Sequence, residues 1–235
     1  MMFEKMRDTW TKAVQPIVVR LGDLDPSVLT WASLVISLAA FYLLAIASLD
    51  STGYGDFLDH TSMMIIGAVI LVLLAGVFDA LDGALARHQG TDGPYGDFLD
   101  HTIDRIVDVG LLIAIGYNAA FVIDPMAGYA AALLTLLGSY MGTQAQSVGL
   151  GRLYGGFSRA DRLVITLAGL LWAAYQAGTG GAGIDVSGIH QYAECALLGN
   201  TEFNGMTLAL AVSFWGGIYT FLVRFAETRK RLLSD

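Results

Sequence analysis

Long stretches without a charged side chain dominate the pattern of hydrophobic and polar positions. Five of them approach or exceed the length of about 20 apolar residues that a helix needs to cross a bilayer. A sixth uncharged stretch, residues 109–123, is too short to cross alone, and it reaches that length only in a helix that begins near Asp97. The pattern therefore predicts six transmembrane helices, over residues 26–49, 61–86, 97–123, 125–146, 163–184 and 203–225.

The first twenty residues show a different pattern, with apolar residues three or four positions apart and charged residues between them. Trp10, Val14 and Ile17 fall on one side of a helix and Lys5 on the other. This spacing predicts an amphipathic helix over residues 1–20 that lies on the inner membrane surface. We therefore predict an all-α integral membrane fold, with the whole chain forming a single membrane domain.

The composition supports this fold class and excludes others. Apolar residues make up 55% of the chain and charged residues only 14%, whereas soluble domains carry roughly 25% charged residues. The formal net charge of −8 excludes a nucleic-acid-binding protein, whose binding surface would be basic. The single cysteine, Cys195, excludes an intramolecular disulfide and a zinc ribbon.

The basic residues predict the orientation. With a cytoplasmic N-terminus, the six spans place all 13 lysines and arginines on the cytoplasmic side, in agreement with the positive-inside rule. The opposite connections carry acids and no base, and the glycine-rich residues 178–205 form an outer loop. We therefore expect a cell-membrane protein with both termini in the cytoplasm.

Acidic residues gather where the second predicted span ends and the third begins. Asp79 and Asp82 are three positions apart, and Asp100 and Asp104 are four apart, so that each pair lies on one helix face. The short loop over residues 88–95 makes the two helices antiparallel neighbours. Four carboxylates at a membrane edge need compensation by cations, and oxygen ligands favour Mg²⁺, Mn²⁺ or Ca²⁺. Two such ions are the usual device for a displacement at phosphorus.

An aspartate at a helix end can also be a simple cap. This interpretation suits Asp97, which follows Gly96 at the start of the third span. It does not suit Asp79 and Asp82, because they lie at the C-terminal end of their helix, where the helix dipole disfavours anions. We therefore expect these two to hold a cation.

The acids belong to the pattern Asp-x2-Asp-Gly-x2-Ala-Arg-x8-Gly-x3-Asp-x3-Asp. This pattern resembles the signature of the CDP-alcohol phosphotransferases, also called CDP-alcohol phosphatidyltransferases. The matching positions are Asp79, Asp82, Gly83, Ala86, Arg87, Gly96, Asp100 and Asp104. The resemblance also covers the six-span layout. It implies transfer of a phosphatidyl-type group from a CDP-linked lipid to a polar alcohol, with release of CMP, at an active site that faces the cytoplasm.

The resemblance also implies roles for single residues. Asp79, Asp82, Asp100 and Asp104 would be ligands of a two-metal Mg²⁺ or Mn²⁺ site, and Asp104 would also be the catalytic base. The residues that would contact the CDP-lipid are Asp79, Gly83, Ala86, Arg87 and Gly96. Helix packing by small residues is the alternative role of Gly83 and Ala86. We expect membrane lipids and a second copy of the chain, in a homodimer, as the other partners.

Four arginines predict the acceptor class. Arg152, Arg159, Arg162 and Arg224 fall on the cytoplasmic side, where they would bind a phosphate on the acceptor, such as glycerol phosphate or inositol phosphate. The alternative is that they contact anionic lipid. Residues 156–162 are similar to a loop of the inositol-phosphate-using branch of the family. Residues 140–146, however, contain two glutamines where that branch has charged residues, which leaves glycerol phosphate and unphosphorylated alcohols such as serine open.

One segment of the chain occurs twice. Residues 54–61 repeat residues 95–102 letter for letter, but the first copy lacks the upstream acids, and we assign it no catalysis.

The acidic outer side suits a high-salt habitat, for which the donor would be CDP-archaeol in place of CDP-diacylglycerol.

Two other protein classes are alternatives, a membrane prenyltransferase and an ion-coupled transporter. The first does not normally have the Gly-x2-Ala-Arg element, and the second would hold its acids at the midplane of the membrane.

Overall fold

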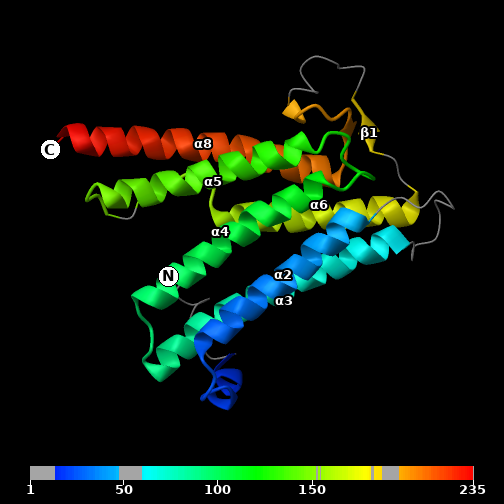
Figure 1. Ribbon diagram of the computed structural model, residues 1–235. Coiled ribbons are helices and arrows are strands. Elements are labelled where there is room, and N and C mark those ends of the chain that lie inside the picture. Colours follow the sequence, from blue (N-terminus) through cyan, green and yellow to red (C-terminus); the bar gives the residue numbers. More distant parts are fainter. Residues whose placement is uncertain are drawn as a thin grey trace. The chain divides into compact units, whose positions relative to one another are not determined.

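The computed structural model describes residues 14–47, 60–151, 153, 155–180, 183–186 and 196–234. The fold is helical, with one short antiparallel pair of strands (Figure 1). The helices are α2 (Pro26–Ile46), α3 (His60–Gln89), α4 (Pro94–Gly116), α5 (Met126–Ser147), α6 (Arg159–Thr179) and α8 (Gly205–Ser234), and the strands are β1 (Ile184–Asp185) and β2 (Glu202–Phe203). Of the predicted amphipathic helix, residues 14–20 are described, and they are helical.

Three of these helices, α2, α3 and α8, are long and apolar enough to cross a membrane by length and composition. Large apolar side chains point outward from them, among them Val35, Ile70 and Leu222, each more than half exposed. Such side chains are unfavourable in water and favourable in lipid. The protein is therefore an all-helical membrane protein.

Several helix ends differ from the predicted ends of the spans; α8 continues to Ser234, nine residues beyond the predicted end at residue 225, and α4 and α6 end early. Helix α4 ends at Gly116, seven residues before the predicted end of its span at residue 123. Beyond it, the buried Asn118 amide donates hydrogen bonds to the carbonyls of Leu44, in the last turn of α2, and Ala47, directly after that helix. Carbonyls at a helix end have no partner within the helix. Helix α6 ends at Thr179, before residue 184, because Gly180 takes a left-handed conformation (φ 65°) that closes the helix.

The chain divides into two compact units. The first unit contains residues 1–39 and 70–107, and the second contains residues 40–69 and 108–235. Helices α2, α3 and α4 therefore contribute one part to each unit.

A small apolar core holds the first unit together. Val14 and Val18 pack with Leu29 of α2 and with Leu81 and Leu85 of α3, and all five are buried. Burial of a side chain such as Leu85 contributes roughly 1.5–3 kcal/mol. Val14 of the predicted apolar face is therefore buried against α2 and α3, whereas Ile17 of the same face is 47% exposed.

Small residues let the helices of the second unit approach closely. Helix α8 packs against α5 and α6. A Cβ atom on Gly217 would lie 2.7 Å from the backbone carbon of Leu134, and one on Gly138 would lie 3.3 Å from Thr220. Close backbone contact of this kind is typical of membrane helices. Helix α6 starts with a capping box, in which Ser158 and Asp161 each accept a backbone hydrogen bond from the other.

Candidate active site

Three of the predicted ligands come together in the first unit. Each of Asp79, Asp100 and Asp104 offers a carboxylate oxygen, and these oxygens all lie within 4.8 Å of one another. The fold explains the convergence. Helix α3 ends at Gln89 and α4 begins at Pro94, with Gly90 in the left-handed conformation (φ 67°) between them, so the chain reverses within a few residues.

Asp82, the fourth predicted ligand, is held differently. Its side chain is buried (7% exposed) and accepts a hydrogen bond of 2.5 Å from the hydroxyl of Thr30 on α2. It does not belong to the group of three, although it interacts electrostatically with the carboxylates of Asp79 and Asp100. The four acids therefore form a trio and a separate, hydrogen-bonded fourth carboxylate.

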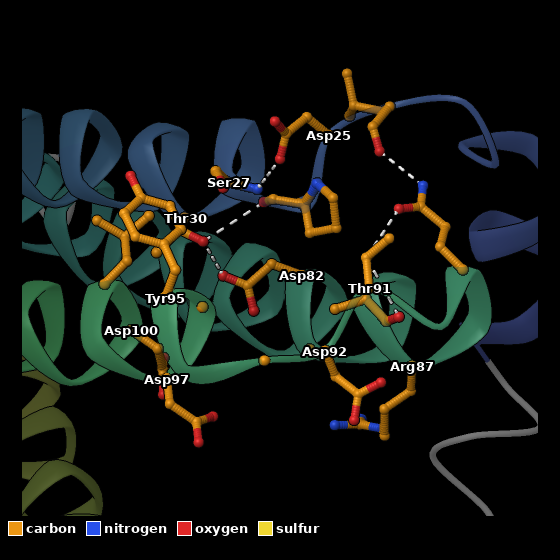
Figure 2. A pocket seen from close by; sticks show the side chains of 18 of the residues that line it. Asp25, Ser27, Thr30, Asp82, Arg87, Thr91, Asp92, Tyr95, Asp97 and Asp100 are labelled. Atoms are coloured by element: carbon orange, nitrogen blue, oxygen red, sulfur yellow. Dashed lines mark hydrogen bonds between the residues drawn. The ribbon is translucent and has the colours of Figure 1, made fainter.

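A pocket of about 1020 Å³ opens beside these acids. Figure 2 shows its side chains, with Asp82 and Thr30 on one side and Asp97 and Asp100 on another. The lining includes every residue that the sequence predicted to contact a CDP-lipid, namely Asp79, Gly83, Ala86, Arg87 and Gly96. A pocket of this size fits a small-molecule ligand.

The segment before α2 and the first residues of that helix form another wall of the pocket, which the sequence did not predict. Residues 22–27 line the pocket together with Thr30. The side-chain amide of Gln89 holds this segment in place, because it donates hydrogen bonds of 2.9 Å to the carbonyl of Gly22 and 2.8 Å to that of Leu24. Gln89 lies in the variable stretch of the motif, two residues after Arg87, and no periodicity or spacing marks it.

Gly83 has a local reason to be glycine. A Cβ atom there would lie 3.3 Å from an Nη atom of Arg87, one turn further along α3. The guanidinium group of Arg87 therefore lies over Gly83. The sequence suggested two other reasons for this glycine, a close approach of the nucleotide and helix packing. The structure adds a third, since a larger side chain would displace the guanidinium group of Arg87.

Asp97 is not the N-cap of α4. The helix begins at Pro94, and Asp97 lies within its first turn, where its backbone N–H donates to the carbonyl of Gly93. A negative charge in a first turn stabilises a helix through the dipole. Asp97 lines the pocket but lies outside the trio.

The predicted acceptor arginines belong to the second unit, where an acid that the sequence analysis missed contacts two of them. Asp108 of α4 lies 3.0 Å from Nε of Arg159 and 3.7 Å from Nη2 of Arg162. Arg162 also donates a hydrogen bond to the carbonyl of Phe157. A signal for Asp108 was present, since an acid inside a predicted span needs a partner.

Arg224 of α8 contacts the backbone of two other segments. It donates hydrogen bonds to the carbonyls of Gly138 (2.8 Å) and Gly155 (3.3 Å). Arg152 and most of the repeated segment at residues 54–61 lie outside the described residues.

The trio fits a divalent cation. Two oxygens bound to one Mg²⁺, Mn²⁺ or Ca²⁺ ion lie at most about 4–5 Å apart, and the oxygens of the trio meet that limit. All three side chains are partly buried, so solvent screens their mutual repulsion less than at a free surface. The donor set contains oxygen only, which favours hard ions.

Comparison with solved structures identifies proteins of similar fold. The fold is similar to crystal structures of phosphatidylinositol phosphate synthase (PgsA1) from Mycobacterium tuberculosis. The structure with CDP-DAG bound has a TM-score of 0.66 and 23% identity, covering 92% of this chain and 94% of that one. The structure with manganese and citrate gives 0.64 and 23%, covering 93% and 88%. Curated protein sequences give no significant match.

The family model described as CDP-alcohol phosphatidyltransferase matches residues 24–215, which is most of the chain and includes the whole acidic motif. The chain therefore belongs to the CDP-alcohol phosphatidyltransferase family, whose members are transferases of substituted phosphate groups.

Proposed function

We propose that the protein transfers a phosphatidyl-type group from a CDP-linked lipid to a polar alcohol with release of CMP, and that the reaction depends on Mg²⁺ or Mn²⁺. One observation carries this proposal: the oxygens of Asp79, Asp100 and Asp104 converge within 4.8 Å, in a chain of this family. Asp79 and Asp100 also line the large pocket. Together with Asp82, these residues would hold the ions.

The roles of the residues follow from the chemistry of the displacement. The acceptor oxygen attacks the phosphorus that carries the lipid, the bond from this phosphorus to the bridging diphosphate oxygen breaks, and CMP leaves. Asp104 takes the proton of the acceptor hydroxyl. Arg87 pairs with a phosphate of the CDP group, since it lies on the pocket wall. Divalent ions, when bound, neutralise charge on the diphosphate and on the departing CMP.

The proposal includes the membrane arrangement. Helices α4, α5 and α6 contain 23, 22 and 21 residues, a length that can span a bilayer. Together with α2, α3 and α8 they would give six spans, with the site at the cytoplasmic side as the positions of the basic residues predict. The donor would be CDP-archaeol or CDP-diacylglycerol, and the protein would act as a homodimer.

For the acceptor we propose a phosphorylated polyol, glycerol phosphate or inositol phosphate. The similar Mycobacterium tuberculosis protein is named a phosphatidylinositol phosphate synthase. In this chain, Arg159 and Arg162 both contact Asp108, so two guanidinium groups lie close together. Neighbouring guanidinium groups can bind a phosphate group through charge-assisted hydrogen bonds.

A second candidate acceptor is an unphosphorylated alcohol such as serine, and a specific observation favours it. Each acceptor arginine that the structure describes already has partners within the protein. Arg159 and Arg162 contact Asp108, and Arg224 donates to two backbone carbonyls. Arginines that are engaged in this way bind a phosphate only by exchanging or sharing those contacts.

CMP release tests the proposal. The purified full-length protein is incubated with CDP-diacylglycerol or CDP-archaeol, with Mg²⁺ or Mn²⁺, and with glycerol phosphate, inositol phosphate or serine. We expect CMP release that requires both the metal and one acceptor and that stops when EDTA is added. Absence of CMP release with every combination, from protein that is folded, would contradict the proposed function.

A further inference from the structure

A buried hydrogen bond joins α2 to the acidic motif. The hydroxyl of Thr30 lies 2.5 Å from Oδ2 of Asp82, which is 52 positions away in the sequence (Figure 2). Both side chains are buried, with 5% of Thr30 and 7% of Asp82 exposed. The carbonyl oxygen of Pro26, at 3.4 Å, is a much more distant alternative acceptor. Because a hydroxyl has one proton, Thr30 donates to the carboxylate.

This bond fixes one oxygen of Asp82. A short hydrogen bond to a carboxylate is about twice as strong as one between neutral groups, so it restricts rotation of the carboxylate. Asp82 lines the pocket and interacts electrostatically with Asp79 and Asp100. Carboxylates that ligate metals are commonly held through a hydrogen bond of this kind.

We propose that Thr30 is a positioning residue of the metal site, whose hydroxyl orients Asp82 so that its second oxygen can ligate a divalent ion. This inference rests on the proposed function, because it takes Asp82 as a ligand. It goes further in assigning a role to a residue outside the motif, on a different helix. It also separates Asp82 from the trio, whose carboxylates do not depend on Thr30.

Two other buried hydroxyls on α2 show that the contact of Thr30 is specific. Ser33 donates to the carbonyl of Thr30, and Ser37 donates to the carbonyl of Ser33, both at 2.8 Å. Both bonds are local to the helix, whereas Thr30 reaches α3. Ser37 is buried to the same degree, with 1% exposed, and therefore provides a matched control.

The test is a titration of the purified full-length protein with Mn²⁺, followed through the electron paramagnetic resonance signal of the free ion and without any CDP-lipid. We expect Thr30→Val to raise the Mn²⁺ dissociation constant of one bound ion by about 10–100-fold. Thr30→Ser, which keeps the hydroxyl, and Ser37→Ala, which removes a hydroxyl elsewhere on α2, should stay close to the wild type. Thr30→Ala removes the same hydroxyl and replaces Thr30→Val if the valine variant does not fold.

A double variant distinguishes orientation from general damage. If Thr30 acts through Asp82, Thr30→Val combined with Asp82→Asn binds Mn²⁺ no more weakly than Asp82→Asn alone. Additive losses would overturn the inference. Wild-type Mn²⁺ affinity in Thr30→Val, or an equal loss in Thr30→Ser, would also overturn it and leave the proposed function intact. A wild-type protein that binds no Mn²⁺ would remove the proposed function itself, and the role of Thr30 with it.

Discussion

Partly buried charged side chains are arranged in opposite ways in the two units. In the first unit, the carboxylate oxygens of Asp79, Asp100 and Asp104 converge within 4.8 Å. In the second, the carboxylate of Asp108 lies between Arg159 and Arg162. The trio has two basic neighbours, since Arg105 lies 3.9 Å from Asp104 and His101 lies 3.3 Å from Asp100. Its three carboxylates still repel one another and gain from an added cation, whereas Arg159 and Arg162 have a counter-charge in Asp108.

This difference predicts different effects of substitutions in the two clusters. Because a bound cation stabilises the trio most, we expect substitutions there to affect metal binding and turnover. The cluster around Asp108 gains less from an added ligand, so changes there should affect stability as well as binding. Variants in each unit test this distinction.

The largest effect should come from Asp104→Asn. Loss of the base should lower kcat by about 10²–10⁴-fold, while binding of the CDP-lipid is largely retained because Asp79 and Arg87 remain. Initial rates of CMP release give kcat, and a fluorescent CDP-lipid gives the affinity. Asp97→Asn is the matched control, since Asp97 lines the pocket on the same helix but lies outside the trio. Similar mild effects of the two variants would remove Asp104 from its role.

The acceptor arginines should give the next largest effect. If they bind an acceptor phosphate, replacing one of them with alanine removes a charge-assisted hydrogen bond of about 1.5–3 kcal/mol, and the acceptor KM rises by about one to two orders of magnitude. The KM for the CDP-lipid should change far less. The measurement compares four single variants, Arg152→Ala, Arg159→Ala, Arg162→Ala and Arg224→Ala.

Unchanged acceptor KM values in all four variants would instead favour the free alcohol. The described arginines would then serve the contacts that the structure shows, with Asp108 and with the carbonyls of Gly138 and Gly155.

A smaller effect on stability should follow from Asp108→Asn. The variant removes the negative charge that contacts Arg159 and Arg162 in a partly buried position. We expect a loss of about 1–2 kcal/mol, between the values for exposed and fully buried pairs, and a Tm lower by several degrees. Thermal unfolding in detergent measures it. Glu227→Gln breaks an exposed ion pair with Arg231 in the same unit and should leave Tm nearly unchanged. Equal Tm values for both variants would show that Asp108 does not stabilise the second unit.

The sequence predicted the parts of the site that are close together along the chain. The spacing of Asp79, Asp100 and Asp104 on two neighbouring helices was enough to bring them together, because a short loop connects those helices. Thr30 and Gln89 could not be found in this way. Their roles depend on contacts with distant segments, and a threonine or glutamine at those positions has no distinctive pattern.

The helix ends show the same limit. The uncharged stretch that ends at residue 123 suggested a longer helix than α4, which ends at Gly116. Hydrophobicity reports which residues avoid water, but the end of this helix depends on the buried amide of Asn118 and its contacts with the end of α2. The role of Asp108 could be predicted only in part. Its position inside a predicted span indicated that it has a partner, but the sequence did not identify Arg159 and Arg162 as the partners.

The smallest effect should come from Gly83→Ala. The added methyl group would lie 3.3 Å from Nη1 of Arg87, so the flexible guanidinium group has to move by a few tenths of an ångström. Since Arg87 is proposed to contact the diphosphate, we expect the KM for the CDP-lipid to rise by about two- to tenfold, within the energy of one charge-assisted hydrogen bond, with the acceptor KM unchanged. Gly76→Ala is the control, because a Cβ atom there meets nothing within 4 Å on the same helix. If Gly83→Ala also leaves the CDP-lipid KM unchanged, the position of Arg87 over Gly83 has no part in substrate binding. If Gly83→Ala raises the KM far more than Arg87→Ala does, the nucleotide itself approaches the helix backbone at Gly83.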